Sequence, residues 1–155
     1  MKLFIDGWKS HICFSSAHIL PGCGQCSRLH GHTYALHIEI TGEIGKKGML
    51  MDFTEIKKNL RSIADELDHH VLLPKKYITK QNPGEVVVVA EGKKYLFPLE
   101  DCKVLPISSS TAEHLAYYIL ERICSTLEFP SHISGVSIGV DEGMGQGAWV
   151  HRTVK

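Results

Sequence analysis

The segment HTYALHIEI, residues 32–40, decides the fold. Its apolar residues share one parity and the residues between them share the other: Tyr34, Leu36, Ile38 and Ile40 against Thr33, Ala35, His37 and Glu39. Because successive side chains of a strand point to opposite faces of the sheet, this alternation predicts a strand with one apolar face. It is the most regular strand pattern in the sequence, so the other elements are placed around it.

Strand patterns also lie on either side of this segment. SHICFSSAH, residues 10–18, alternates with Ile12, Phe14, Ser16 and His18 on one parity, which predicts a strand that ends on a histidine. The intervening LPGCGQCSRL, residues 20–29, is rich in Gly, Cys and Ser and is typical of a loop. After residue 40, GEIGKKG predicts a turn into a short strand at 49–51, which would make an antiparallel pair.

Two amphipathic helices are predicted further along the chain. Asp52 and Glu55 have capping-box spacing before a run of apolar residues at helical spacing that ends near Asp68. A second box, Ser110 with Glu113, opens a helix that Pro130 terminates. Between the helices, the 74–106 segment contains a predicted hairpin, 85–90 with 94–97. A last strand is predicted at 136–140, followed by a glycine-rich turn.

The order of elements is strand, strand, strand, helix, hairpin, helix, strand. Strands do not alternate one-for-one with helices, so the pattern favours an α+β fold with a mainly antiparallel sheet and helices packed on one face. Residues 1–155 fit one domain of ordinary size. We expect a single domain with a hairpin-containing insertion at about 74–106.

Composition excludes several classes of protein. With 17 basic and 17 acidic residues there is no basic excess, and we expect no nucleic-acid partner. No apolar run approaches membrane-spanning length and the N-terminus does not resemble a signal peptide, so we expect no membrane partner and a cytoplasmic location. The five cysteines are an odd number, which argues against a disulfide framework.

Histidines are placed where strands would bring them together. In an extended chain the rings of His30 and His32 lie on one face, and His18 lies on the apolar parity of its own strand. If the two strands pair, three imidazoles converge at one rim. Three neutral histidines suit zinc and leave a fourth position open, as a catalytic site requires.

A second arrangement uses the thiol of Cys26, in CSRLHGHTY (residues 26–34), and that of Cys23, three residues before it. Cys23, Cys26, His30 and His32 would form a closed Cys2His2 site, which would make the protein a structural zinc module and not an enzyme. The spacing of this set is tighter than in ordinary zinc fingers, whose ligand pairs stand a dozen or more residues apart. The residues alone leave both arrangements open.

The motifs FSSAH, CSRLHGH, ITG, MDF, LDHH, STAEHLAYYI and VDEG, in this order from Phe14 onward, resemble the 6-pyruvoyl-tetrahydropterin and 6-carboxy-tetrahydropterin synthase family. The resemblance implies zinc bound by His18, His30 and His32. It implies a catalytic Cys26 assisted by Asp68 and His69. It also implies a pterin ring anchored by Glu142, with Thr111 as a secondary contact.

The resemblance further implies a fold, an assembly and a reaction. The fold would be the tunnelling fold, in which subunits join their sheets into a barrel as a trimer stacked into a hexamer. Active sites would lie between subunits, with Cys26 and Glu142 from different chains. The substrate would be 7,8-dihydroneopterin triphosphate and the product 6-carboxy-5,6,7,8-tetrahydropterin, a step toward queuosine-type deazapurines. Formation of 6-pyruvoyl-tetrahydropterin and aldolase-like cleavage of the side chain remain alternatives.

The sequence departs from the family pattern in three places. Cys23 adds a thiol near Cys26, and the 74–106 segment is longer than the expected link. Gly143 stands where the family often has threonine. These departures bear on metal selection, on substrate choice and on pterin contacts, respectively.

Overall fold

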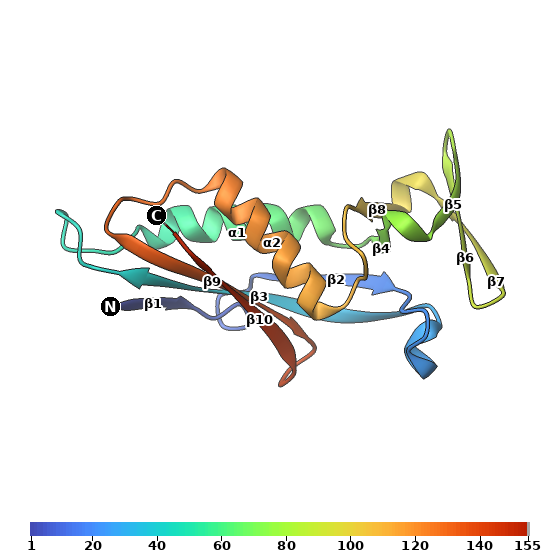
Figure 1. Ribbon diagram of the computed structural model, residues 1–155, viewed down its shortest axis with the longest axis horizontal. Coiled ribbons are helices and arrows are strands. Elements are labelled where there is room, and N and C mark those ends of the chain that lie inside the picture. Colours follow the sequence, from blue (N-terminus) through green and yellow to red (C-terminus); the bar gives the residue numbers. More distant parts are fainter. Residues whose placement is uncertain (155) are drawn as a thin grey trace.

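A computed structural model describes residues 1–154 (Figure 1). The main sheet has the strand order β10-β9-β3-β2-β4-β8, and β1 pairs with β3 beside the end of β2. Its strands are β1 (Lys2–Ile5), β2 (Cys13–His18), β3 (His30–Gly42), β4 (Val71–Pro74), β8 (Cys102–Leu105), β9 (Ile133–Glu142) and β10 (Gly147–Thr153). Helices α1 (Phe53–Leu67) and α2 (Ala112–Thr126) both lie on one face of this sheet, as Figure 1 shows. The predicted α+β fold with two helices on one face is confirmed.

The strand predicted at 32–40 is part of the long strand β3, which lies in the interior of the sheet. It pairs antiparallel with β9 along one side, and with β2 and then β1 along the other. Tyr34, Leu36, Ile38 and Ile40 are fully buried beneath the helices. Ala35 and His37 on the opposite face are buried as well, so the middle of β3 is covered on both sides.

The helices close the core over the sheet. The Asp52 side chain accepts a hydrogen bond from the Thr54 amide at 2.7 Å, which confirms the predicted start of α1. The predicted box at α2 is wrong: the N-cap residue is Thr111, and it makes no capping hydrogen bond through its side chain. Ser110, one residue earlier, is buried and points into the protein.

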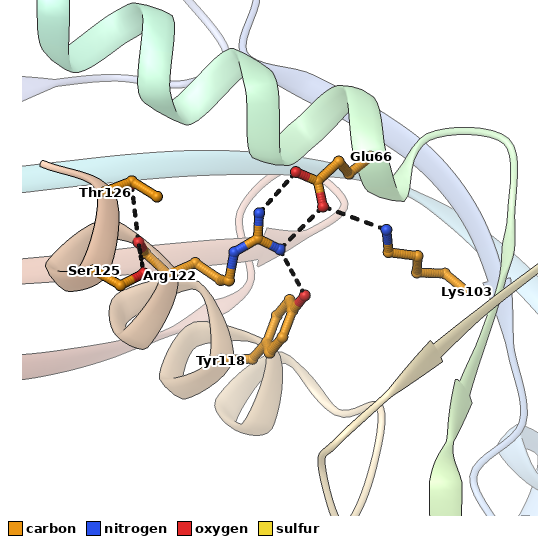
Figure 2. Close-up of polar contacts among 6 residues, drawn as sticks. All are labelled: Glu66, Lys103, Tyr118, Arg122, Ser125 and Thr126. Atoms are coloured by element: carbon orange, nitrogen blue, oxygen red, sulfur yellow. Dashed lines mark hydrogen bonds and ion pairs between the residues drawn. The ribbon is translucent and has the colours of Figure 1, made fainter.

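An ionic cluster connects the two helices and β8 (Figure 2). Arg122 of α2 donates to both carboxylate oxygens of Glu66 of α1, at 2.7 and 3.0 Å, and to the Tyr118 hydroxyl at 2.9 Å. Lys103 of β8 lies 3.3 Å from the same carboxylate. The two helices therefore share a bidentate, charge-assisted contact in addition to their apolar packing.

Most of the 74–106 segment forms a second, three-stranded sheet of β5 (Ile78–Asn82), β6 (Glu85–Ala90) and β7 (Lys93–Pro98), in the order β5-β6-β7, whereas β8 at its end joins the main sheet. The predicted hairpin is confirmed and gains β5 as a third strand. Short 3-10 helices flank this sheet at Lys75–Tyr77 and Leu99–Asp101. Leu73, Val86 and Val88 form a separate buried apolar cluster that ties the small sheet to β4.

Several sequence predictions of strands are wrong. Residues 49–51 are not a strand, and β1 takes the place beside β3 instead. The first long strand begins at Cys13, because residues 6–12 form a turn in which the Ser10 amide donates to the Asp6 carbonyl. The prediction of a mainly antiparallel sheet is confirmed: the pairings among β1, β2, β3, β9 and β10 are antiparallel, and only β4 and β8 join in parallel. Neither helix among residues 1–154 is long and apolar enough to cross a membrane.

Candidate metal centre and active site

Three imidazoles meet where β2 and β3 pair. His18 lies directly opposite His30 in the antiparallel register, and His32 follows on the same face of β3. The ring centroids are 4.5 Å (His18–His30), 5.3 Å (His18–His32) and 5.0 Å (His30–His32) apart. Gly31 lies between them with its α-carbon close to β2, where a side chain would contact the Ser16 carbonyl at 3.0 Å. The predicted convergence of the three rings is confirmed.

Backbone carbonyls fix which nitrogen of two rings is free. His18 Nδ1 lies 2.9 Å from the Ser110 carbonyl, and His30 Nδ1 lies 2.7 Å from the Arg28 carbonyl. A carbonyl only accepts, so each Nδ1 carries the hydrogen and each Nε2 presents a lone pair. The two Nε2 atoms are 3.1 Å apart. Such second contacts orient histidines that bind metals.

Glu142 completes the cluster. It ends β9, whose register places it opposite Tyr34 on the histidine face of the sheet. Its Oε1 lies 2.9 Å from His32 Nε2 and 3.1 Å from His18 Nε2. The donor atoms of the three histidines and Glu142 all lie within 4.8 Å of one another.

The electrostatics of this cluster favour a cation at its centre. The adjacent imidazole of His18 holds the pKa of Glu142 below its usual range, so the carboxylate is charged near neutral pH. Burial lowers the pKa of His32, even though Glu142 opposes this, so its ring is neutral. His32 Nε2 is buried and has no hydrogen-bond partner of proper geometry. A carboxylate and converging lone pairs are stable together only around a positive charge. The residues therefore fit a metal ion.

Cys26 lies outside this set of donors. It is exposed within the short 3-10 helix Gly24–Ser27, on the loop between β2 and β3. It lines a small hollow together with His30. Among residues 1–154, the only side chains grouped closely enough to hold one ion are the three histidines and Glu142. The Cys2His2 arrangement is therefore wrong: neither Cys23 nor Cys26 joins His30 and His32.

Asp68 and His69 lie together at another hollow. The Ser15 amide donates to Asp68 at 2.7 Å, and His69 Nδ1 lies 2.7 Å from the other Asp68 oxygen. Burial opposes the charge of Asp68, but hydrogen bonds from Ser15 and His69 outweigh it, so its pKa is lowered. His69 has φ of 58°, an unfavourable value for a residue with a side chain. Its ring lines a hollow of about 600 Å³ with Ser15, Thr33 and His32.

The single chain thus brings some predicted site residues together and separates others. The three histidines and Glu142 form one cluster, and Glu142 reaches it within the same chain, so it needs no second subunit. Cys26 and His69 line different hollows. Thr111 is the N-cap of α2, next to the Ser110 carbonyl that orients His18, and its hydroxyl lies 3.2 Å from His114 Nδ1.

Sequence reasoning missed three contributors to the cluster. The orienting carbonyls of Ser110 and Arg28 belong to the backbone, which carries no residue-type signal. Tyr34 was predicted only as part of an apolar face, but its hydroxyl lies 3.3 Å from His18 Nδ1. Burial raises the pKa of Tyr34, so this hydroxyl stays protonated. Its parity with His32 was the one signal available.

Known proteins share this architecture. The sequence matches the 6-pyruvoyl tetrahydropterin synthase family over residues 9–152. It is 38% identical over 154 residues to a Methanocaldococcus jannaschii protein provisionally named 6-carboxy-5,6,7,8-tetrahydropterin synthase, covering 96% of this chain and 94% of that one. It is 30% identical over 116 residues to the 6-carboxy-5,6,7,8-tetrahydropterin synthase of Haemophilus influenzae, covering 71% and 76%.

A solved structure agrees with the sequence relatives. The 6-pyruvoyl tetrahydropterin synthase of Plasmodium vivax superimposes with a TM-score of 0.90 at 28% identity, covering 99% of this chain and 98% of that one. The match extends through the sheet, both helices and the strands that carry the histidine cluster. On this evidence the chain belongs to the 6-pyruvoyl tetrahydropterin synthase family.

Proposed function

We propose that this protein is a zinc-dependent lyase that converts 7,8-dihydroneopterin triphosphate to 6-carboxy-5,6,7,8-tetrahydropterin with loss of triphosphate. The observation that carries the proposal is the convergence of three imidazoles, two of them oriented by backbone carbonyls, and one charged carboxylate. Three imidazole nitrogens suit zinc and leave a fourth position open for the substrate. The choice of product follows the names of the Methanocaldococcus and Haemophilus relatives.

The metal would be held by His18, His30 and His32. When bound, it would supply Lewis-acid polarisation of the substrate's side-chain oxygens. Glu142 lies at the edge of the same cluster and is charged, so its carboxylate can accept two hydrogen bonds from the amino-pyrimidine edge of a pterin. Thr111, beside the Ser110 carbonyl, is a further candidate for pterin contact.

Proton transfer is assigned to Cys26, Asp68 and His69. Cys26 is exposed beside His30, where a thiolate can remove a proton from the substrate side chain. Asp68 fixes the orientation of the His69 ring through their 2.7 Å contact, as in other carboxylate–imidazole pairs. Because Cys26 and His69 line different hollows of one chain, we propose that neighbouring subunits of a trimer or hexamer bring them together.

The strands at the margins of the sheet support this assembly. Among residues 1–154, β10 pairs only with β9, so its outer edge is available for pairing with another strand. Joining such edges between subunits would satisfy these groups and close the proposed barrel. We further propose that residues 1–155 are a single pterin-synthase domain, with the 74–106 segment as an elaboration of it.

Metal content and turnover in two variants test this function. In Cys26→Ala, bound zinc should remain while conversion of dihydroneopterin triphosphate is lost. In His30→Ala, both should be lost. Lys58→Ala, which changes an exposed residue of α1, serves as the control and should retain both. Loss of zinc from Cys26→Ala, with full retention in His30→Ala, would contradict the proposal.

A second candidate is formation of 6-pyruvoyl-tetrahydropterin, which the similarity to the Plasmodium vivax enzyme favours. The same residues serve both reactions, because the two products differ in the path of the protons. Mass spectrometry of the product of the unaltered protein distinguishes them. The same measurement would detect aldolase-like cleavage as a pterin that has lost its side-chain carbons.

A further inference from the structure

We propose that Glu91, at the tip of the β6–β7 hairpin, is a positioning residue that holds the loop carrying Cys26. In this role the small sheet of the 74–106 segment supports the loop that carries Cys26 from outside the main sheet. This inference rests on the proposed function, since it concerns the placement of the proposed catalytic thiol.

The hairpin tip and the loop are in direct contact across a long stretch of sequence. The Gly22 amide donates to the Glu91 carboxylate at 2.5 Å, although the residues are 69 positions apart. The contacts with the Gly22 amide and then the Ser27 side chain hold the pKa of Glu91 below its usual range. The carboxylate is therefore charged near neutral pH. In Figure 1 the β6–β7 turn lies close to the blue loop that follows β2.

The loop needs such a contact. Residues 19–29 connect His18 to His30, which are paired directly across β2 and β3. Most of the loop is exposed, and its internal hydrogen bonds are short-range, such as Cys26 amide to Cys23 carbonyl at 3.1 Å. Exposed segments with few buried anchors open most easily. A fixed point at Gly22 would therefore limit the positions available to the Cys26 thiol.

The hairpin is a firm support for this contact. Its turn has two residues, Glu91 and Gly92, between the paired residues Ala90 and Lys93. Both have positive φ, 48° and 75°, which is the geometry of a type I′ turn. The buried Val86 and Val88 anchor the hairpin to Leu73 of β4. The small sheet thus connects the loop to the same framework that carries β2.

The identity of residue 91 is the second, independent observation. The first position of a type I′ turn favours Asn, Asp or Gly, and a glutamate there adopts a costly left-handed conformation. Unfavourable backbone conformations persist where another contact depends on them. The Glu91 side chain provides that contact, because its length lets the carboxylate reach Gly22.

Substitution of Glu91 separates the contact from the stability of the turn. Glu91→Asn suits the turn better than glutamate but is one methylene shorter, so the hairpin should stay folded while the contact to Gly22 is lost. Glu91→Gln keeps the side-chain length and an acceptor oxygen, so this variant should keep the hydrogen bond from the Gly22 amide. Glu100→Asn, at an exposed acidic residue of the same segment, is the matched control.

Two readouts are measured on the full-length, zinc-loaded protein. Deuterium uptake of a peptide covering residues 19–29 should be faster in Glu91→Asn than in the unaltered protein, Glu91→Gln and Glu100→Asn. Turnover of dihydroneopterin triphosphate by Glu91→Asn should show kcat reduced about tenfold or more at unchanged KM and zinc content, because misplaced catalytic groups cost rate.

The outcomes distinguish this inference from the proposed function. Unchanged uptake in Glu91→Asn, or equal impairment of Glu91→Gln and Glu91→Asn, would overturn the positioning role. Unchanged kcat with an active parent protein would overturn it too. If the unaltered protein converts no pterin substrate, the proposed function fails, and the uptake comparison alone decides whether Glu91 holds the loop.

Discussion

The contact between Glu66 and Arg122 gives a quantitative prediction about how the two helices are held together (Figure 2). We predict that a double-mutant cycle with Glu66→Gln and Arg122→Met measures a coupling free energy of about 1 kcal/mol. Arg122 makes two hydrogen bonds to the carboxylate, which places the pair at the strong end of surface ion pairs. The side chains of Arg122 and Glu66 are 31% and 35% exposed, so solvent screens their charges and limits the coupling free energy.

The single substitutions should cost more than the coupling. Arg122→Met removes the donor to Tyr118 as well and leaves Glu66 with Lys103 as its remaining cation. We therefore expect Arg122→Met to lower the free energy of unfolding by about 1–2 kcal/mol. In a domain of this size that corresponds to a decrease in Tm of about 2–8 °C.

The pH dependence provides an internal check. Hydrogen bonding to Arg122 lowers the pKa of Glu66, so the folded-state value lies below the unfolded one. The stabilisation is therefore present above the unfolded pKa of about 4.3 and is lost as the pH falls through the folded value. The difference in stability between the unaltered protein and Glu66→Gln should shrink in the same range.

Urea denaturation followed by circular dichroism measures all four proteins of the cycle at one protein concentration, which keeps any concentration-dependent contribution to apparent stability the same in each. A coupling below about 0.3 kcal/mol at pH 7, or one that does not decrease on acidification, would refute the reasoning, because exposed pairs without firm geometry fall at that low end.

Three further predictions follow from the site and its surroundings. Removal of zinc by a chelator should lower Tm by about 5–10 °C when the ion had been present at about 100 times its Kd, and His32→Ala should show no zinc-dependent change in calorimetry; an unchanged Tm in the parent protein would contradict the metal site. Mixed oligomers of Cys26→Ala and His69→Ala should recover activity in about a quarter of their sites if neighbouring chains share a site, and an inactive mixture would show that each chain supplies both residues itself. Trp8→Phe removes the 2.8 Å hydrogen bond from the indole to Asp141 and should cost about 1 kcal/mol in a urea titration, whereas no loss would show that this contact does not hold the N-terminal turn.

The elements that the sequence predicted best are long and regular. β3, α1 and α2 are long enough to repeat the strand or helix period several times, so the buried face of each could be assigned from the local sequence pattern alone. β1, β4 and β8 have four residues each, which is too short for a period to be recognised. The apolar run at 49–51 resembled a strand, but β1 pairs with β3 instead. The local sequence pattern cannot decide which of two segments pairs with a given strand.

The sequence by itself determined which chemistry is available. The parity of His30 and His32 on one strand, and of His18 on another, follows from the two-residue repeat of extended chain. The tertiary structure decided which other groups of the protein contact these three imidazole rings. The register of β9 against β3 brings Glu142 to the cluster, and the start of α2 places the Ser110 carbonyl on His18.

The same division holds for the thiols and for Glu91. Spacing allowed Cys23 and Cys26 to be metal ligands, but in the folded chain neither thiol lies within the cluster of His18, His30, His32 and Glu142. No local pattern connects Glu91 to Gly22. The physical reason is that side-chain periodicity depends on neighbours in sequence, whereas contacts between distant segments depend on how whole elements pack and register.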